Sequence, residues 1–189
     1  MAYPHAGNRI EAELKYQQAR REVMDLLEQE IAQLIGVDGL RLSDIDEDAL
    51  VAADAWRELY AIVGREFHMP AWSWRKALRK FRRRPRRVEL AIWAEGQLCG
   101  LALGRVSDRC IVSTIHLLEG NPADTPLDGK IIAIATRFLD LFALGLGCRD
   151  ASIESPVPEL IERYKQQGFV KEVTKGKKVL RLKKSIPQG

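Results

Sequence analysis

The sequence has few cysteines and few histidines, and neither type forms a cluster. Cys99, Cys110 and Cys148 include no close pair and no spacing typical of metal ligands. The three histidines are likewise scattered along the chain. An odd, sparse set of thiols is typical of reduced cysteines inside the cell, so we expect a cytoplasmic protein without a bound metal.

Long apolar runs are also missing. None approaches the ~20 residues that span a bilayer, and the N-terminal residues lack the apolar stretch and cleavage site of a secretion signal. The sequence contains no GxxxxGK[ST] loop, no Rossmann glycine fingerprint and no GxSxG elbow. With 189 residues, 46% of them apolar, the chain is suited to one folded domain with a small appendage and no membrane partner.

Positive charge is concentrated in one segment. Residues 75–87 contain nine Lys or Arg and no acidic residue, whereas the rest of the chain has 21 basic and 26 acidic residues. Such a patch attracts polyanions, so nucleic acid is one candidate partner and an anionic cofactor with several phosphates is another. The alternative is a solvated helix face. Aromatic residues nearby could stack on bases, but Trp74, Leu78 and Phe81 have the spacing of an apolar helix stripe, which we favour.

The apolar periodicity predicts secondary structure along the whole chain. Spacings of three and four predict helices over 9–35, 47–66, 71–83, 129–146 and a short segment ending near 167. Alternation predicts strands over 40–45, 88–94, 98–106, 110–118, 149–154, 169–173 and 179–184. We therefore expect an α/β (α+β) fold, with a helical extension over 1–38 and the main domain over 39–189.

The strongest local signal is the segment 159–169, which reads ELIERYKQQGF. It predicts a helix that carries Tyr164 and ends at Gly168, directly before a strand. In this setting, and with the predicted order of elements from about 40 to 184, the chain resembles the GNAT superfamily of acyl-CoA N-acyltransferases. The resemblance implies a mixed, mostly antiparallel central sheet flanked by helices.

The resemblance also implies a reaction and a cofactor site. The reaction would move an acetyl group from acetyl-CoA to an amine, by direct attack through a tetrahedral intermediate. Tyr164 would contact the cofactor and protonate the leaving thiolate. The other cofactor-binding residues implied by the resemblance are Leu117, Leu118, Asp128, Gly129, Lys130, Ile131 and Ser155.

The loop that would hold the pyrophosphate departs from the family pattern. Gly129 matches a family glycine, but Pro126 stands in place of Arg or Gln and Ile131 in place of a small residue. Asp128 could alternatively serve as a cap for the following helix.

An amine must lose a proton when it attacks, so the reaction needs a base. Glu119 is one candidate, because GNAT enzymes often carry a carboxylate after the central strand. His116 is the other, and strand alternation predicts that it lies on the face opposite Glu119.

The acceptor itself is not specified by the resemblance. The basic helix 75–87 falls where GNAT proteins build the acceptor site, which favours a polyanionic acceptor. Its expected contacts are Arg75, Arg79, Arg82, Arg83 and Arg84. The alternative function is a catalytically silent GNAT-like module that binds nucleic acid or protein through this helix. A further alternative is a homo-oligomer that associates through the N-terminal helix.

Overall fold

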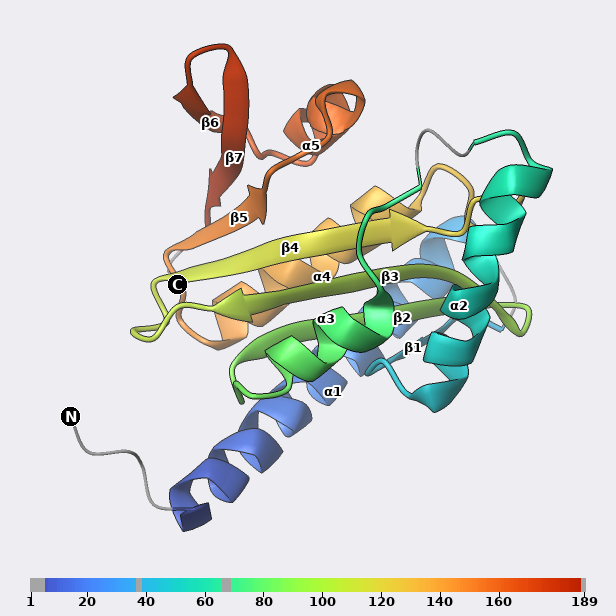
Figure 1. The fold of residues 1–189 in the computed structure, drawn as a ribbon. Helices are drawn as coiled ribbons and strands as arrows, with labels where there is room; N and C mark the ends of the chain where they lie inside the picture. Colours follow the sequence, from blue (N-terminus) through green and yellow to red (C-terminus); the bar gives the residue numbers. More distant parts are fainter. Residues whose placement is uncertain (1–5, 37–38, 66–68, 188–189) are drawn as a thin grey trace.

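The computed structural model describes residues 6–36, 39–65 and 69–187. Its strands form one sheet in the order β1-β2-β3-β4-β5-β7-β6 (Figure 1). All neighbouring strands are antiparallel except β4 and β5, which are parallel. The strands are β1 Arg41–Ser43, β2 Arg87–Ala94, β3 Gln97–Val106, β4 Val112–Gly120, β5 Asp150–Glu154, β6 Lys171–Lys175 and β7 Lys178–Ser185.

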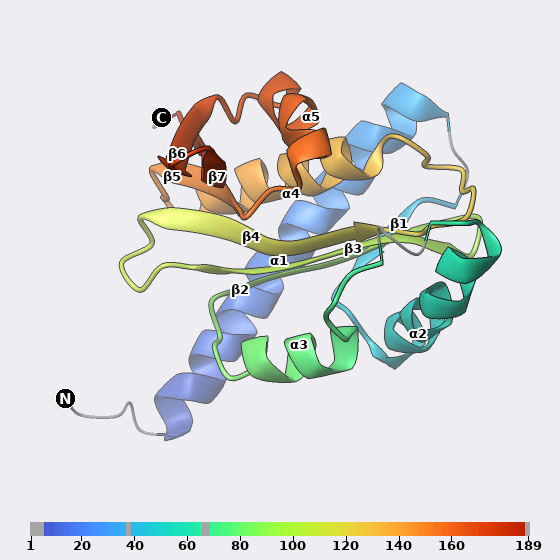
Figure 2. The ribbon, with the colours of Figure 1, turned by 45° about the horizontal axis from the view of Figure 1, so that its top comes forward.

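Helices cover both faces of this sheet. The helices are α1 Ala6–Ile35, α2 Glu47–Ile62, α3 Trp74–Phe81, α4 Ile131–Gly145 and α5 Ile161–Gln166, the last preceded by a 3₁₀ turn, Pro158–Leu160. Figure 2 shows α1 and α4 on one side of the sheet and α2 and α3 on the other. One hydrophobic cluster lies between the sheet and α1, α4 and α5, and a second lies beneath α2 and α3. The predicted fold class is confirmed.

The main difference from the predicted elements lies in the basic segment. The helix predicted over 71–83 begins at Trp74, after Ser73 at its N-cap, and ends at Phe81. Pro85 cannot donate a backbone hydrogen bond, and β2 begins shortly after it at Arg87. The basic segment is therefore half helix and half turn. The predicted helix end at residue 66 lies outside the described residues, and α2 ends at Ile62.

Helix α1 contributes to the core of the molecule. Val23, Met24 and Leu27 are buried in the same cluster as α4 and the sheet. The opposite side of the helix exposes Leu14 and Leu26, so association with another copy through α1 stays a prediction. The predicted boundary near residue 38 lies outside the described residues.

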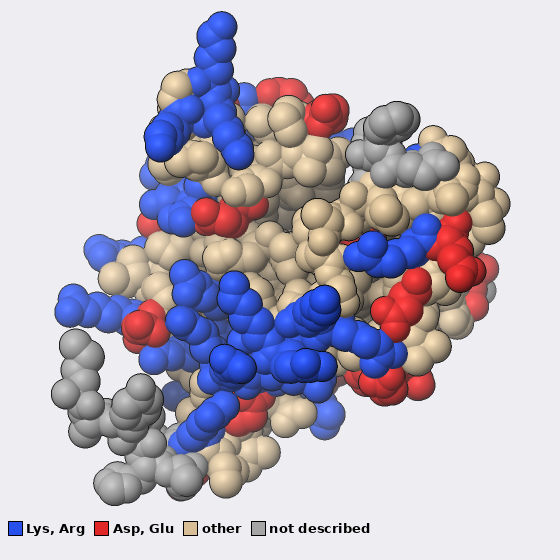
Figure 3. All heavy atoms as spheres, in the orientation of Figure 1, with Lys and Arg blue, Asp and Glu red and all other residues tan. Residues whose placement is uncertain are grey.

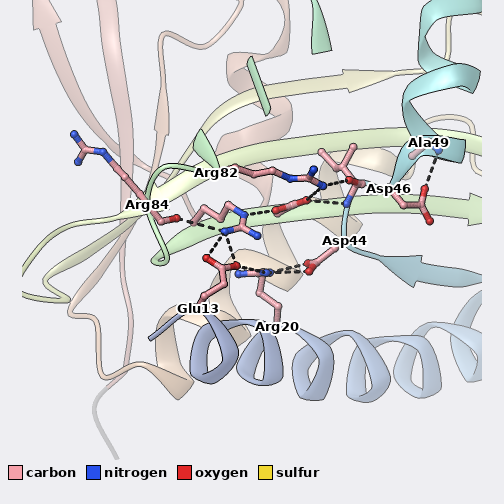
Figure 4. Close-up of polar contacts among 10 residues, drawn as sticks. Glu13, Arg20, Asp44, Asp46, Ala49, Arg82 and Arg84 are labelled. Carbon is pink, nitrogen blue, oxygen red and sulfur yellow. Dashed lines mark hydrogen bonds and ion pairs between the residues drawn. The ribbon is translucent and has the colours of Figure 1, made fainter. Parts of the chain in front are cut away.

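A buried network of ion pairs joins α1 to the sheet (Figure 4). The Arg20 side chain is fully buried, and its Nε and Nη2 donate to the two carboxylate oxygens of Asp44 at 2.7 and 2.9 Å. Glu13 lies between Arg20 and Arg87, with ion-pair distances of 3.8 and 2.6 Å. Arg87 in turn pairs with Glu89 of β2. Opposite charges thus alternate through the buried space between α1 and β2.

The same network reaches the loop before α2 and the end of α3. Glu89 accepts the Ile45 N–H at 3.1 Å, and Arg82 donates to the Ile45 carbonyl at 2.9 Å. Arg82 also lies 3.7 Å from the Glu89 carboxylate. These contacts hold the C-terminal end of α3 against the sheet.

Replacement of Arg20 tests whether α1 and the sheet fold as one unit. Arg20→Ala leaves the Asp44 and Glu13 carboxylates without their guanidinium partner, so we expect a loss of about 3–5 kcal/mol in the free energy of unfolding. The control is Arg21→Ala, because Arg21 is exposed and is expected to change stability little. Urea unfolding measures both variants. An equally small loss for both would contradict the role of the network.

Candidate functional site

Strands β4 and β5 pair over a short stretch and then diverge. Their register runs from Val112 opposite Asp150 to Ile115 opposite Ile153. Strand β4 then continues to Gly120, with no partner on that side among the described residues. The edge of β4 from residue 116 onward therefore has backbone groups free to bind an extended ligand.

A β-bulge lies at the point where pairing with β5 stops. Leu103 of β3 pairs with Leu117, and Gly104 pairs with Ile115, so His116 is the extra residue. The two strands approach very closely here: a Cβ atom on Gly104 would lie 1.9 Å from the Thr114 carbonyl oxygen. Only glycine fits this position without separating the strands.

The bulge changes which side chains share a face. The His116 ring lies 5.6 Å from the Phe81 ring of α3, and Glu119 contacts α2 and α3 through hydrogen bonds. Both side chains are therefore on the α2–α3 face. The prediction that they lie on opposite faces was wrong, because simple alternation does not apply across a bulge.

The opening between β4 and β5 leads into a cavity of about 780 Å³. The cavity brings together part of the predicted site: His116, Leu117, Leu118, Ser155 and Tyr164. Helix α3 covers it with Lys76, Lys80 and Phe81, and Trp72 lines it as well. Phe81 and Trp72 are thus available to a ligand. Trp74 and Leu78 are buried, as expected for residues of the predicted apolar helix stripe.

Tyr164 can donate a proton in this cavity. Its side chain is buried, and its hydroxyl has no hydrogen-bond partner among the described residues. Burial raises the pKa of Tyr164 to about 12, because the phenolate would lose hydration. The hydroxyl is therefore fully protonated at neutral pH.

The pKa of His116, in the same cavity, is shifted in the opposite direction. Its Nε2 atom is buried and has no hydrogen-bond partner in the described part of the chain. Burial lowers the pKa of His116, and the positive charges of Arg105, Arg181 and Lys80 lower it further, against the Glu154 charge. The imidazole is therefore neutral at pH 7 and can accept a proton.

Glu119 lies outside this cavity. Its carboxylate accepts hydrogen bonds from Trp74 Nε1 at 2.6 Å and from the Tyr60 hydroxyl at 3.1 Å, and it lines a separate small hollow. Burial raises the pKa of Glu119, although the two hydrogen bonds act in the other direction. These contacts join β4 to α2 and α3, so Glu119 positions the wall of the cavity.

The loop before α4 is organised by Asp128. Its carboxylate accepts hydrogen bonds from the Thr125 N–H at 3.1 Å and the Thr125 hydroxyl at 3.0 Å. The alternative that Asp128 caps α4 is wrong, because the N-cap residue is Lys130 and no side chain caps the helix. Gly129 has φ +75°, a conformation that favours glycine and directs the chain into α4.

The N-terminus of α4 therefore has free amide groups. The N–H groups of Gly129, Ile131, Ile132 and Ala133 have no acceptor among the described residues. The Ile131 side chain packs toward the sheet, where a Cβ on Gly100 would lie only 2.7 Å from its Cγ2 atom. Consequently, this large residue does not obstruct the amides.

A hollow of about 240 Å³ lies beside these amides, lined in part by Gly129, Ile132 and Arg163. Arg163, on α5, is exposed and has no acidic partner in the described ranges. Sequence reasoning did not select Arg163, although it directly precedes Tyr164. A cation and a helix N-terminus together form a site suited to phosphate.

The structure divides the predicted acceptor residues into two groups. Arg75 pairs with Asp54 at 2.7 Å and Glu47 at 2.6 Å, and the half-exposed Arg82 lies 3.7 Å from the buried Glu89 carboxylate. Arg79, Arg83 and Arg84 have no carboxylate partner among the described residues and are exposed. Figure 3 shows Lys and Arg side chains gathered over α3 and again on the β6–β7 hairpin.

Among the described residues, no group of His, Cys, Asp and Glu side chains has the arrangement of a metal site. No described helix combines the length and the apolar character that crossing a bilayer requires.

No protein-family model and no curated protein sequence matches the chain, but solved structures do. An acetyltransferase from Thermus thermophilus is 18% identical, with a TM-score of 0.56 over 79% of this chain and 99% of that one. The ribosomal-protein-S18-alanine N-acetyltransferase from Escherichia coli is 15% identical, with a TM-score of 0.54 over 79% and 96%. The chain has the GNAT fold.

A third structure has the same fold with a coenzyme bound. It is the PaiA N-acetyltransferase from Thermoplasma acidophilum in complex with coenzyme A, which is 13% identical, with a TM-score of 0.52 over 78% of this chain and 99% of that one. At these identities the likeness establishes the fold. The GNAT resemblance predicted from the segment around Tyr164 is confirmed at this level.

Substitution of Gly104 tests the importance of the bulge. Gly104→Ala forces β3 away from the Thr114 carbonyl, so we expect a stability loss of about 1–3 kcal/mol or more and a displaced His116. Gly120→Ala is the matched control, since the nearest heavy atom to its new Cβ would be 3.7 Å away, an ordinary contact. Thermal unfolding compares the two variants, and similar losses would contradict the close approach at Gly104.

Proposed function

We propose that this protein is an N-acetyltransferase that uses acetyl-CoA as co-substrate and transfers the acetyl group to an amine. The proposal is carried by the opening between β4 and β5, where a protonated Tyr164 and a neutral His116 line the same cavity. N-Acetyltransferases with the GNAT fold, one of them bound to coenzyme A, support it.

Acetyl-CoA carries a pyrophosphate and amide groups that could bind the unpaired backbone groups of α4 and β4. The unpartnered amides at the start of α4, with Lys130 and Arg163 nearby, would hold the pyrophosphate. The free edge of β4 at Leu117 and Leu118 would pair with the amide groups of the pantetheine arm. The Ser155 hydroxyl, at the cavity wall, would contact the same co-substrate.

The chemistry needs one proton acceptor and one proton donor. As the amine nitrogen bonds to the thioester carbon, His116 takes the proton that the nitrogen loses. When the tetrahedral intermediate collapses, the C–S bond breaks and Tyr164 donates its proton to the departing thiolate. His116 and Tyr164 then exchange protons with solvent and return to their starting states.

The competing function is a silent module that binds nucleic acid or protein through the basic helix. Arg75 and Arg82, two residues that it would use, are held in ion pairs, and the helix ends at Phe81. These pairings favour the enzyme. Cytoplasmic location stays a prediction.

Calorimetric titration with acetyl-CoA tests the proposed function. We expect micromolar binding by the wild type, at least tenfold weaker binding by Arg163→Glu, and unchanged binding by Tyr164→Phe. Lys177→Glu is the matched control, because Lys177 is exposed in the β6–β7 turn, away from the site. No binding up to millimolar acetyl-CoA would overturn the proposal and favour the silent module.

Kinetics with an amine that accepts the acetyl group test the two proton-transfer residues. Tyr164→Phe should lower kcat roughly a hundredfold or more with little change in KM for acetyl-CoA, because it removes the proton donor. An unchanged kcat would rule out this role for Tyr164.

The pH dependence tests His116. The base must be neutral, so the rate should fall as pH decreases through its lowered pKa, below the usual value of about 6.5. The charged side chains that act on it are Lys80 of α3, Arg105 of β3, Glu154 of β5 and Arg181 of β7. His116→Gln should lose this acid limb, and a profile that keeps it would assign the base elsewhere.

A further inference from the structure

A second hollow adjoins the cavity on the other side of His116. It has a volume of about 250 Å³, and three arginines from separate parts of the chain line it. Arg84 comes from the turn after α3, Arg105 from β3 and Arg181 from β7. Because His116 lines both the hollow and the cavity, a ligand in the hollow lies directly beside the proposed base.

Positive charge exceeds negative charge in this arginine hollow. Arg84 and Arg105 have no carboxylate partner among the described residues. Arg181 forms an ion pair with Glu154, in which Nη2 lies 2.6 Å from Oε2. Asp108 is the one acidic residue among those that line the hollow. Arg84 and Arg105 are therefore available to a ligand.

Three positively charged side chains around one hollow repel one another unless an anion offsets their charge. Guanidinium groups bind phosphate particularly well, because their N–H donors match its oxygen atoms in pairs. A long nucleic acid would extend beyond this hollow of about 250 Å³, over the exposed Arg79 and Arg83 of the basic segment. The arrangement therefore suits one compact phosphate better than a polymer.

We infer that the acceptor is a small primary amine bearing a phosphate group, and that the arginine hollow binds this phosphate while the amine reaches His116. This inference rests on the proposed function. Arg105 is the central specificity residue, because it is unpaired and lies on the strand next to the bulge. Lys76 and Lys80, at the wall of the main cavity, add further attraction for an anionic acceptor.

Calorimetry with O-phosphoethanolamine and ethanolamine tests the inference. Saturating CoA is present throughout, so that the amides of α4 are occupied and do not bind the phosphate. We expect O-phosphoethanolamine to bind at least tenfold more tightly than ethanolamine, and Arg105→Gln to weaken its binding at least tenfold. Arg109→Gln is the matched control, because Arg109 is exposed in the β3–β4 turn and does not line the hollow.

Circular dichroism confirms that each variant is folded, and Arg84→Gln provides a second test of the same hollow. Equal binding of the two amines, or no effect of either arginine substitution, would overturn the inference. A single-stranded RNA 12-mer is the competing probe. If it binds more tightly than O-phosphoethanolamine and loses affinity in Arg105→Gln, the small acceptor is overturned in favour of nucleic acid.

Acetyl-CoA is titrated into the same samples without CoA. Acetyl-CoA binding without Arg105-dependent phosphate binding would overturn the acceptor class and leave the proposed function in place. Arg105-dependent phosphate binding without acetyl-CoA binding would overturn the proposed function, and with it the acceptor role, while the hollow would remain an anion site.

Discussion

The site depends on the one parallel strand pair in the sheet. Parallel neighbours need a long crossover, and here α4 provides it between β4 and β5. Because the crossover begins where β4 ends, the N-terminus of α4 and the open edge of β4 lie at the same end of the sheet. The pairing stops at Ile115 and Ile153, and the bulge at His116 follows at once. The divergence of the strands and the bulge produce the cavity, and the start of α4 provides the free amides at a separate hollow.

Burial shifts the pKa values of two cavity residues, Tyr164 and His116, in opposite directions. It raises the pKa of Tyr164, whose charged form is an anion, and it lowers the pKa of His116, whose charged form is a cation. A protonated phenol and a neutral imidazole therefore line one cavity at neutral pH. Glu119 lies outside this cavity, and its carboxylate accepts hydrogen bonds from Trp74 and Tyr60.

The arginines of the basic segment lie in two different surroundings. Arg82 and Arg87 complete a buried network with Glu13 and Glu89, which holds α1, β2 and the end of α3 together. Arg84, two residues after Arg82, turns instead to the hollow beside His116. Adjacent residues of equal charge thus have different roles, because the chain leaves the helix after Phe81 and reverses direction at Pro85.

The sequence by itself determined the order of helices and strands and the burial of Trp74 and Leu78, because these follow from local periodicity. The segment around Tyr164 carried the resemblance to the GNAT superfamily. The sheet face on which His116 lies depended on the register between β3 and β4. A one-residue bulge shifts this register and so changes the face to which side chains point. The Ile131 side chain of α4 packs closely on the sheet because residue 100, on strand β3, is glycine. The convergence of Arg84, Arg105 and Arg181 was likewise decided by the tertiary structure alone, since contacts between distant segments have no signature in local spacing.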